Sequence, residues 1–281
     1  MKNNEFVSFC TLKETKLETL LINLGYSKQL IKKELTKKQR EFVLFSQKEI
    51  QIPINLLNDK KIKPAYYSES LNILFENSSF LVVEKPSNLH SHPLHYDETD
   101  NVLSWLVGMG RYDIDRVNNS SYDRGLLFRL DFETSGLLIF AKSDLLYSYF
   151  RKNFSTAIIE KKYTAIVRGE FNYNGLIEHW IKNREEKGSK IMAFESEVLN
   201  TRLAQMEVSA KYIEAKKISL IEIKLKSGHK HQIRVQLAAL GFPIIGDFLY
   251  GGEAASRLFL HSSRYELESI DQQHYEFFSE L

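Results

Sequence analysis

The sequence has a single cysteine, Cys10, and only 5 prolines and 13 glycines among its 281 residues. One cysteine excludes an internal disulfide and any metal site built from several cysteines. So little glycine and proline excludes collagen-like and low-complexity chains. No apolar run approaches the roughly 18 residues that a membrane-spanning helix needs, and the N-terminus lacks the apolar stretch of a secretory signal. We therefore expect a cytoplasmic globular protein that does not associate with membranes.

Charge is distributed unevenly, although the net charge is only +2. Residues 1–65 carry 13 basic and 7 acidic side chains, a local charge of +6, so the rest of the chain carries −4. A basic segment on a slightly acidic body suits a partner rich in phosphate, because each neutralised phosphate releases counterions. A lysine-rich surface that is merely solvated has the same composition. Charge alone therefore permits a nucleic-acid partner without requiring one.

The pattern of residues 1–62 indicates a small unit of its own. Leu17, Leu20, Leu21 and Leu24 recur at helical spacing and predict a helix that ends before Gly25. A second helix is expected over 27–38, where five lysines surround an apolar stripe, and strand material follows to residue 54. This order resembles an S4-type RNA-binding module, the alternative being a helical hairpin that only packs against the main domain. Residues 63–70 are expected to be a linker, and residues 71–281 a second domain.

Strands outnumber helices in the second domain. Apolar patterns predict two strands within 71–85, and others over 126–130, 136–142, 161–170, 194–200, 205–213, 218–225 and 257–267. Helices are predicted over 144–154 and 230–240. Because these helices do not alternate regularly with the strands, the pattern favours the α+β class over a doubly wound parallel sheet.

Among the acidic residues, Asp131 has the most informative sequence context. It ends one predicted strand, and Thr134, Ser135 and Gly136 turn the chain into the next. An isolated aspartate in such a turn is usually a structural cap. However, residues 127–142, LFRLDFETSGLLIFAK, resemble the R-L-D-x-x-T-S-G-L-L-x-x-A-K signature of the RluA-type pseudouridine synthases.

Four other segments resemble motifs of the same family in the same order, and together they cover about residues 70–265. They are FLVVEKPSNLHSHP at 80–93, KKYTAIVRG at 161–169, SGHKHQIRVQLAALGFPIIGDFLYGG at 227–252 and RLFLHS at 257–262. The resemblance implies a mixed, largely antiparallel central sheet with flanking helices and a catalytic cleft. It also implies a monomer that isomerises uridine to pseudouridine in structured RNA. Because atoms are conserved and nothing is oxidised, no cofactor and no metal are expected.

The resemblance assigns roles to four residues. Asp131 would be the catalytic carboxylate, acting either as a nucleophile or as a base that takes the 2′ proton of the sugar. Arg234 would pair with Asp131 through a bidentate contact that keeps its pKa low. Tyr163 would stack on the flipped base and assist proton removal at C5, and Leu260 would line the pocket.

The chain departs from the family pattern at positions expected to bind the substrate. Phe128 stands where many members have histidine, beside the retained Arg129, and we expect its ring to fill the stack that the extruded base vacates. His229 and Lys230 replace the usual Arg-Thr, which alters the expected phosphate contacts. His90, His92 and His95 fit no common metal-ligand spacing, so they do not change the expectation of no metal.

These observations favour an enzyme that modifies large-subunit ribosomal RNA. A transfer RNA substrate is the alternative within the same class. A non-catalytic RNA-binding protein on the same fold is a further alternative, and it has no need of the Asp131, Tyr163 and Arg234 set.

Deleting residues 1–65 is expected to weaken RNA binding and to flatten its salt dependence. The reason is that Lys28, Lys32, Lys33, Lys37 and Lys38 would contact phosphates, and their loss reduces the number of counterions released on binding. Dissociation constants measured over a range of salt concentrations test this. An unchanged salt slope would show that these lysines are only a solvated surface.

Overall fold

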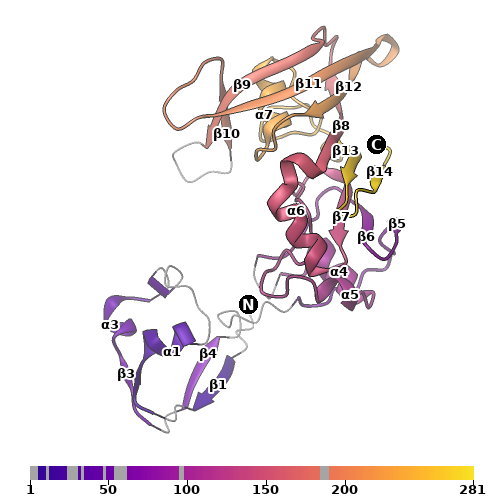
Figure 1. Cartoon of the computed structure of the whole chain (residues 1–281). Coiled ribbons are helices and arrows are strands. Elements are labelled where there is room, and N and C mark those ends of the chain that lie inside the picture. Colours follow the sequence, from indigo (N-terminus) through magenta and orange to yellow (C-terminus); the bar gives the residue numbers. More distant parts are fainter. Residues whose placement is uncertain are drawn as a thin grey trace.

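The structure, a computed structural model, describes residues 6–10, 13–23, 31–32, 35–46, 49–53, 62–94, 98–183 and 190–281 (Figure 1). Near the N-terminus, β1 (Phe6–Cys10) pairs antiparallel with β4 (Glu49–Pro53), and β2 (Thr15–Lys16) pairs with β3 (Val43–Leu44). Helix α1 (Leu17–Asn23) confirms the first predicted helix. The pairing of β1 with β4 was not predicted from the sequence.

The predicted helix over 27–38 lies partly outside the described residues, and its C-terminal end is wrong. Thr36 is extended and caps a separate short helix, α3 (Lys37–Arg40), through a reciprocal pair of hydrogen bonds with Gln39. Of the five lysines proposed to contact RNA, Lys28 and Lys33 fall outside the described residues. The other three, Lys32, Lys37 and Lys38, are exposed.

The segment expected to be a linker has neither helix nor strand, but it packs on helix α4 (Val102–Gly108). The Ala65 N–H donates to the carbonyl of Ser104 at 2.8 Å, and the Tyr67 ring lies 4.4 Å from that of Trp105. Ile62, just before the segment, is buried in the core of the main domain. A truncation that probes the N-terminal unit alone should therefore retain Ile62 and the residues after it.

One ten-stranded sheet forms the main domain, in the order β10-β9-β11-β12-β8-β13-β7-β6-β5, with β14 paired to β13. Only β7 and β13 run parallel among the described pairs, so the sheet is mixed and largely antiparallel, as predicted. The strands are β5 (Ile73–Glu76), β6 (Phe80–Lys85), β7 (Ser135–Ala141), β8 (Ile158–Arg168), β9 (Gly175–Asn183), β10 (Ile191–Phe194), β11 (Arg202–Ile213), β12 (Ile218–Leu225), β13 (Leu260–Glu268) and β14 (His274–Phe278). The remaining helices are α5 (Tyr112–Asp115), α6 (Asp144–Ala157), α7 (Gln232–Ala239) and the 3₁₀ turn η2 (Glu214–Lys216).

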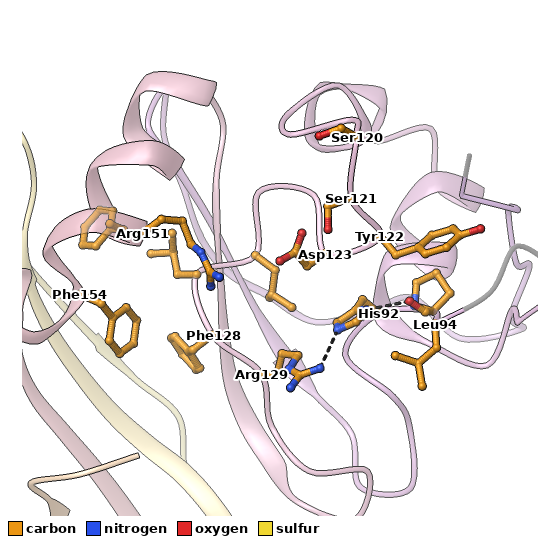
Figure 2. Close-up of a pocket in the computed structure, with 14 residues that line it drawn as sticks. His92, Leu94, Ser120, Ser121, Tyr122, Asp123, Phe128, Arg129, Arg151 and Phe154 are labelled. Atoms are coloured by element: carbon orange, nitrogen blue, oxygen red, sulfur yellow. Dashed lines mark hydrogen bonds between the residues drawn. The ribbon is translucent and has the colours of Figure 1, made fainter. Parts of the chain in front are cut away.

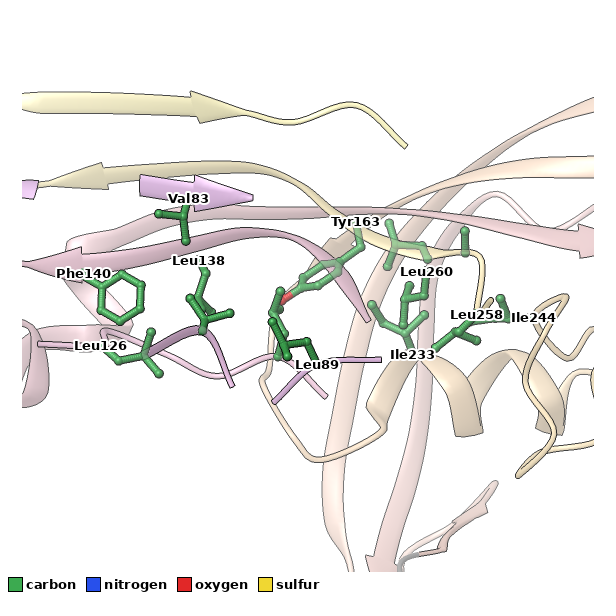
Figure 3. Packing of buried hydrophobic residues seen from close by; sticks show 14 of the residues in the cluster. Val83, Leu89, Leu126, Leu138, Phe140, Tyr163, Ile233, Ile244, Leu258 and Leu260 are labelled. Atoms are coloured by element: carbon green, nitrogen blue, oxygen red, sulfur yellow. The ribbon is translucent and has the colours of Figure 1, made fainter. Parts of the chain in front are cut away.

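Helices cover both faces of the central strands, because side chains alternate in direction along a strand. Leu81 and Leu138 belong to the cluster that includes α4 and α7, whereas Val82 and Ile139 belong to the cluster that includes α6. All seven residues of β7 are buried in consequence. Figure 3 shows the first cluster, in which Tyr163, Ile233 and Leu260 meet.

Two predicted strands are wrong. Residues 126–130 form only one bridge, from Leu126 to Phe140, because the chain then leaves the sheet and the Leu130 N–H donates to the hydroxyl of Ser91. Residues 195–200 form a turn after β10 ends at Phe194. Helix α4 and strands β9 and β14 were not predicted, whereas α6, β8, β12 and α7 lie within two or three residues of the expected bounds.

Gly136 lies near the start of β7, where it pairs in parallel with Ser262 of β13, and it has a φ of +111°. A Cβ atom here would lie 2.4 Å from the carbonyl oxygen of Ser262 in the backbone of β13. Only glycine therefore allows the two strands to approach so closely, which explains the glycine of the T-S-G motif in physical terms.

Gly136→Ala is expected to lower the free energy of unfolding by roughly 2–5 kcal/mol, as the sum of backbone strain and steric overlap. Gly110→Ala is the matched control, because Gly110 also has a positive φ, +81°, but nothing lies within 4 Å of its Cβ position. The control should lose only roughly 1–2 kcal/mol. Denaturant unfolding of both variants makes the comparison, and equal losses would contradict the proposed overlap.

Candidate active site

A cavity of about 670 Å³ opens where the N-terminus of α7 faces the loop before β7 and the strands β8 and β13. All eight residues predicted to form the site line this one cavity. They are Phe128, Arg129, Asp131, Tyr163, His229, Lys230, Arg234 and Leu260. These residues come from four of the five motifs, and the fifth contributes His90 and His92, so the fold brings together segments separated by more than half of the chain.

Asp131 presents a partly desolvated carboxylate to the cavity, with its side chain 26% exposed. Its nearest basic neighbours are His231 Nε2 and Arg234 Nη1, each 3.9 Å from Oδ2. Within the described part of the chain, no side chain makes a hydrogen bond of ordinary length to this carboxylate. Its oxygens are therefore open to a molecule in the cavity.

Burial raises the pKa of Asp131, and the positive charges of His231, when it is protonated, and of Arg234 only partly offset this effect. The negative charge of Glu133 raises the pKa further. The expectation that Arg234 keeps this pKa low is therefore wrong in its net direction. The guanidinium does favour the ionised form, but the loss of hydration outweighs it.

Arg234 is 2% exposed, and its guanidinium makes its bidentate contact with a different carboxylate from the one predicted. Nε and Nη2 each donate to one oxygen of Asp247 at 2.8 Å, and Nη1 donates to Glu133 at 3.0 Å. The 3.9 Å separation between Nη1 and Oδ2 places Arg234 beside Asp131, as predicted, but the predicted bidentate geometry is wrong. Burial lowers the pKa of Arg234, yet its bonds to Asp247 outweigh this and raise the pKa, so the guanidinium stays charged.

His231 reaches Asp131 from an uncommon backbone conformation, with φ 53° and ψ 20° at a residue that is not glycine. Its ring is buried, and Nδ1 lies 3.1 Å from the hydroxyl of Tyr250. Burial lowers the pKa of His231, which favours the neutral ring. When Tyr250 donates to Nδ1, the proton of the neutral ring lies on Nε2 and faces Asp131.

Lys85 holds the loop that carries Asp131. Its side chain is fully buried, and Nζ donates to the carbonyls of Pro86, Leu89 and Phe132 at 2.7–3.0 Å. Burial lowers the pKa of Lys85 to about 7. The lysine of the Lys-Pro motif therefore ties β6 to the residue that follows Asp131.

Tyr163 and Leu260 form the apolar wall of the cavity, and both are buried (Figure 3). The Tyr163 hydroxyl lies 3.1 Å from that of Tyr265. Burial raises the pKa of Tyr163 to about 12. The phenol is therefore neutral at physiological pH, which suits a stacking surface and disfavours the predicted part in proton removal.

The Phe128 ring packs into the wall of the cavity and does not project freely from it. Its ring stacks on that of Tyr265, with centroids 4.1 Å apart and planes 3° from parallel. The expectation that this ring fills a vacated stack is at odds with that packing, because Tyr265 already covers one face. Arg129 is instead the exposed side chain at this position, with Nη1 3.4 Å from His92 Nε2.

His229 and Lys230 lie at an edge of the cavity where basic side chains gather. His229 Nε2 lies 3.0 Å from the carbonyl of Leu203, and Lys230 is exposed. Both also line a smaller recess of about 390 Å³ together with Lys182 and Arg202. This arrangement is compatible with the phosphate contacts expected of them.

Several residues at the cavity were not predicted to contribute. Asp247, Glu133 and Lys161 stand inside recognised motifs, G-D, D-F-E-T-S and K-K-Y, so a signal existed. Tyr265 carries no comparable signal in the sequence. Among the described residues, no cluster of three or more potential metal ligands occurs, and no helix is long and apolar enough to cross a membrane.

Comparisons with known proteins agree on one family. Residues 79–239 match the family described as RNA pseudouridylate synthase. Ribosomal large subunit pseudouridine synthase D of Borreliella burgdorferi is 32% identical over 216 residues, which are 74% of this chain and 64% of that protein. The tRNA pseudouridine synthase C of Vibrio parahaemolyticus is 32% identical over 199 residues, 67% of this chain and 77% of that protein.

The solved structure of human RNA pseudouridylate synthase domain containing 1 superposes with a TM-score of 0.61 at 22% identity, covering 77% of this chain and 86% of that one. At 22% identity, this similarity shows only that the two proteins share a fold. The chain spans a little under two thirds of the length of the Borreliella protein. The sequence match over more than half of the chain and the shared fold lead to one conclusion: this chain belongs to the RNA pseudouridylate synthase family.

Proposed function

We propose that this chain converts specific uridines of structured RNA into pseudouridine, with large-subunit ribosomal RNA as its substrate. The observation that carries the proposal is the Asp131 carboxylate, which faces a cavity between a fixed guanidinium and an aromatic wall. The Borreliella relative, named for the ribosomal large subunit, supports the choice of RNA.

The reaction breaks the N1–C1′ bond, forms a C5–C1′ bond, and moves one proton from C5 to N1, so that atoms and electrons balance. Asp131 acts on the sugar or base either as a nucleophile or as the base that takes the 2′ proton. Arg234, whose Nη1 lies 3.9 Å from Oδ2, stabilises its ionised form, and the neutral His231 ring faces the same oxygen with Nε2. The target uridine must leave its stack to reach them, as for any enzyme that acts on a base.

The walls retain the detached base while it turns. Tyr163 offers a neutral aromatic face, worth roughly 1–3 kcal/mol per stacked base. Leu260 keeps water from that side. Arg129, exposed at the mouth and held near His92, is placed to contact the RNA around the extruded nucleotide.

Pseudouridine mapping in cells with and without this protein tests the substrate. Carbodiimide-dependent primer extension over ribosomal and transfer RNA should show one or more stops that disappear with the protein, in large-subunit RNA. A loss confined to transfer RNA would favour the alternative suggested by the Vibrio relative. No change in either RNA, with RNA binding retained, would favour a non-catalytic binding protein.

Asp131→Asn should reduce pseudouridine formation by at least roughly 10³-fold, because the amide can neither attack nor take a proton. Thermal unfolding and RNA affinity should stay close to wild type, since the shape is kept. Asp271→Asn, at an exposed turn after β13, is the matched control. Turnover by Asp131→Asn at a rate near that of the control would rule out the proposed mechanism.

Arg234→Lys should lower kcat by roughly 10–100-fold, because an ammonium cannot bind Asp247 through two parallel bonds and still reach Asp131. Single-turnover rates and thermal unfolding are measured together, since an unpaired Asp247 also destabilises the fold. Asp247→Asn, which keeps the shape of that partner, should also lower kcat. Arg264→Lys is the control, from an ion-pair network with Glu160 and Glu276, and a loss there as large as at Arg234 would refute the positioning role.

The pH dependence of kcat/KM should report the raised pKa of Asp131. Activity should fall with decreasing pH at a higher pH than an ordinary aspartate would give. Glu133→Gln removes a charge that raises this pKa, so the acid limb should move to lower pH. Glu170→Gln, at an exposed position after β8, is the control and should leave the limb in place. A shift to higher pH in Glu133→Gln would contradict the assignment.

A further inference from the structure

A second cavity, of about 580 Å³, adjoins the candidate active site (Figure 2). The two cavities share five lining residues: His92, Leu94, Phe128, Arg129 and Phe154. A molecule that fills both therefore passes over Phe128 and Arg129. The reaction proposed above takes place in the first cavity only, so it assigns no role to the second.

The second cavity combines apolar walls with a few convergent polar groups, which is the usual make-up of a small-molecule or base pocket. Phe128, Phe154 and Leu127 supply apolar surface. Asp123 and Arg151 supply a carboxylate and a guanidinium, and both point into the cavity in Figure 2. They form no ion pair with each other within 4 Å, so each is open to a ligand.

Asp123 is fixed in place by its neighbours. Asn118 Nδ2 donates to Oδ1 at 3.0 Å, and the Tyr147 hydroxyl donates to Oδ2 at 3.2 Å. Each oxygen keeps a further lone pair for another donor. The loop around it is held by Arg124, which is 2% exposed and bonds to Asp115 and to the carbonyls of Asn119 and Ser121.

Arg151 projects from α6 on the other side of the cavity. Its guanidinium lies 5.9 Å from the centroid of the Tyr147 ring. In the part of the chain that the structure describes, it donates no hydrogen bond and forms no salt bridge. The exposed guanidinium of Arg151 can therefore donate hydrogen bonds, and the fixed carboxylate of Asp123 can accept them, in the same cavity.

We propose that this second cavity binds the base of a nucleotide adjacent to the target uridine, and that it selects guanine. The inference rests on the proposed function, because it takes the strand in the first cavity to be RNA. Guanine offers two donors, N1–H and the N2 amine, to Asp123, and acceptors at O6 and N7 to Arg151. Its ring is flat and suits the space between aromatic side chains.

The other bases fit these groups less well. Uracil offers one donor, N3–H, between two carbonyl oxygens that would oppose the carboxylate. Adenine and cytosine each offer a single amine, next to a ring nitrogen that accepts and cannot donate. Only guanine places two adjacent donors against the carboxylate and keeps an acceptor for the arginine. The cavity therefore reads the neighbour of the target, whereas Asp131 acts on the target itself.

The test uses the RNA site located by pseudouridine mapping, transcribed in vitro with each neighbour of the target replaced in turn by the other bases. With the full-length chain, replacing guanine at one neighbour should lower kcat/KM by roughly 5- to 150-fold, the range for a bidentate base contact. Inosine, which lacks the N2 amine, should give a smaller loss. Asp123→Asn and Arg151→Met should lose the discrimination while still modifying the site.

Lys152→Met is the matched control, since Lys152 neighbours Arg151 on α6 but lines neither cavity. It should discriminate as the wild type does. A target with no neighbouring guanine, or equal turnover with all four bases, would overturn the inference and leave the proposed function standing. Discrimination that survives in Asp123→Asn would also overturn it. No pseudouridine with the wild-type chain would instead overturn the proposed function, and the inference with it.

Discussion

The two parallel hydrogen bonds between Arg234 and Asp247 fix the side of the cavity that α7 contributes. Both side chains are almost entirely buried, so neither charge is compensated by water. Removing one partner of such a pair typically costs about 3–5 kcal/mol, because the other remains buried and unpaired. With Nε and Nη2 occupied, only Nη1 is left to face Glu133 and Asp131. The guanidinium therefore acts on the Asp131 carboxylate from a position that it cannot easily leave.

The loop that carries Asp131 is held from two directions. On one side, Lys85 donates hydrogen bonds to three backbone carbonyls, one of them that of Phe132. Beside it, Glu133 is bound by Arg234. Asp131 itself, between these anchored neighbours, keeps its carboxylate without a short hydrogen bond. Such an arrangement places a reactive group accurately while leaving its lone pairs free, which is the requirement for a preorganised site.

Sequence motifs located the cavity residues well but did not indicate their pairing. The family motifs predicted that four residues lie together in one site, because each motif marks residues of that site. They are Asp131, Tyr163, Arg234 and Leu260. The preference of Arg234 for Asp247 depends on the path of residues 244–250 against α7, which no local pattern encodes. The strand predicted over 126–130 failed for a related reason. Its apolar residues are buried by the tertiary core, but its backbone contacts β7 only at Leu126 and Leu127. The chain then leaves the sheet, and the Leu130 N–H donates to the hydroxyl of Ser91.

Strand β13 lies between β7 and β8 in the central sheet, although more than ninety residues separate it from either along the chain. During synthesis on a ribosome, β7 and β8 therefore emerge long before the strand that joins them. Until residues 260–268 leave the exit tunnel, both have open edges that can pair with the wrong partner. The nascent protein lacks the wall that β13 gives to the cavity in that interval, so the space that Asp131 faces is completed only late in synthesis.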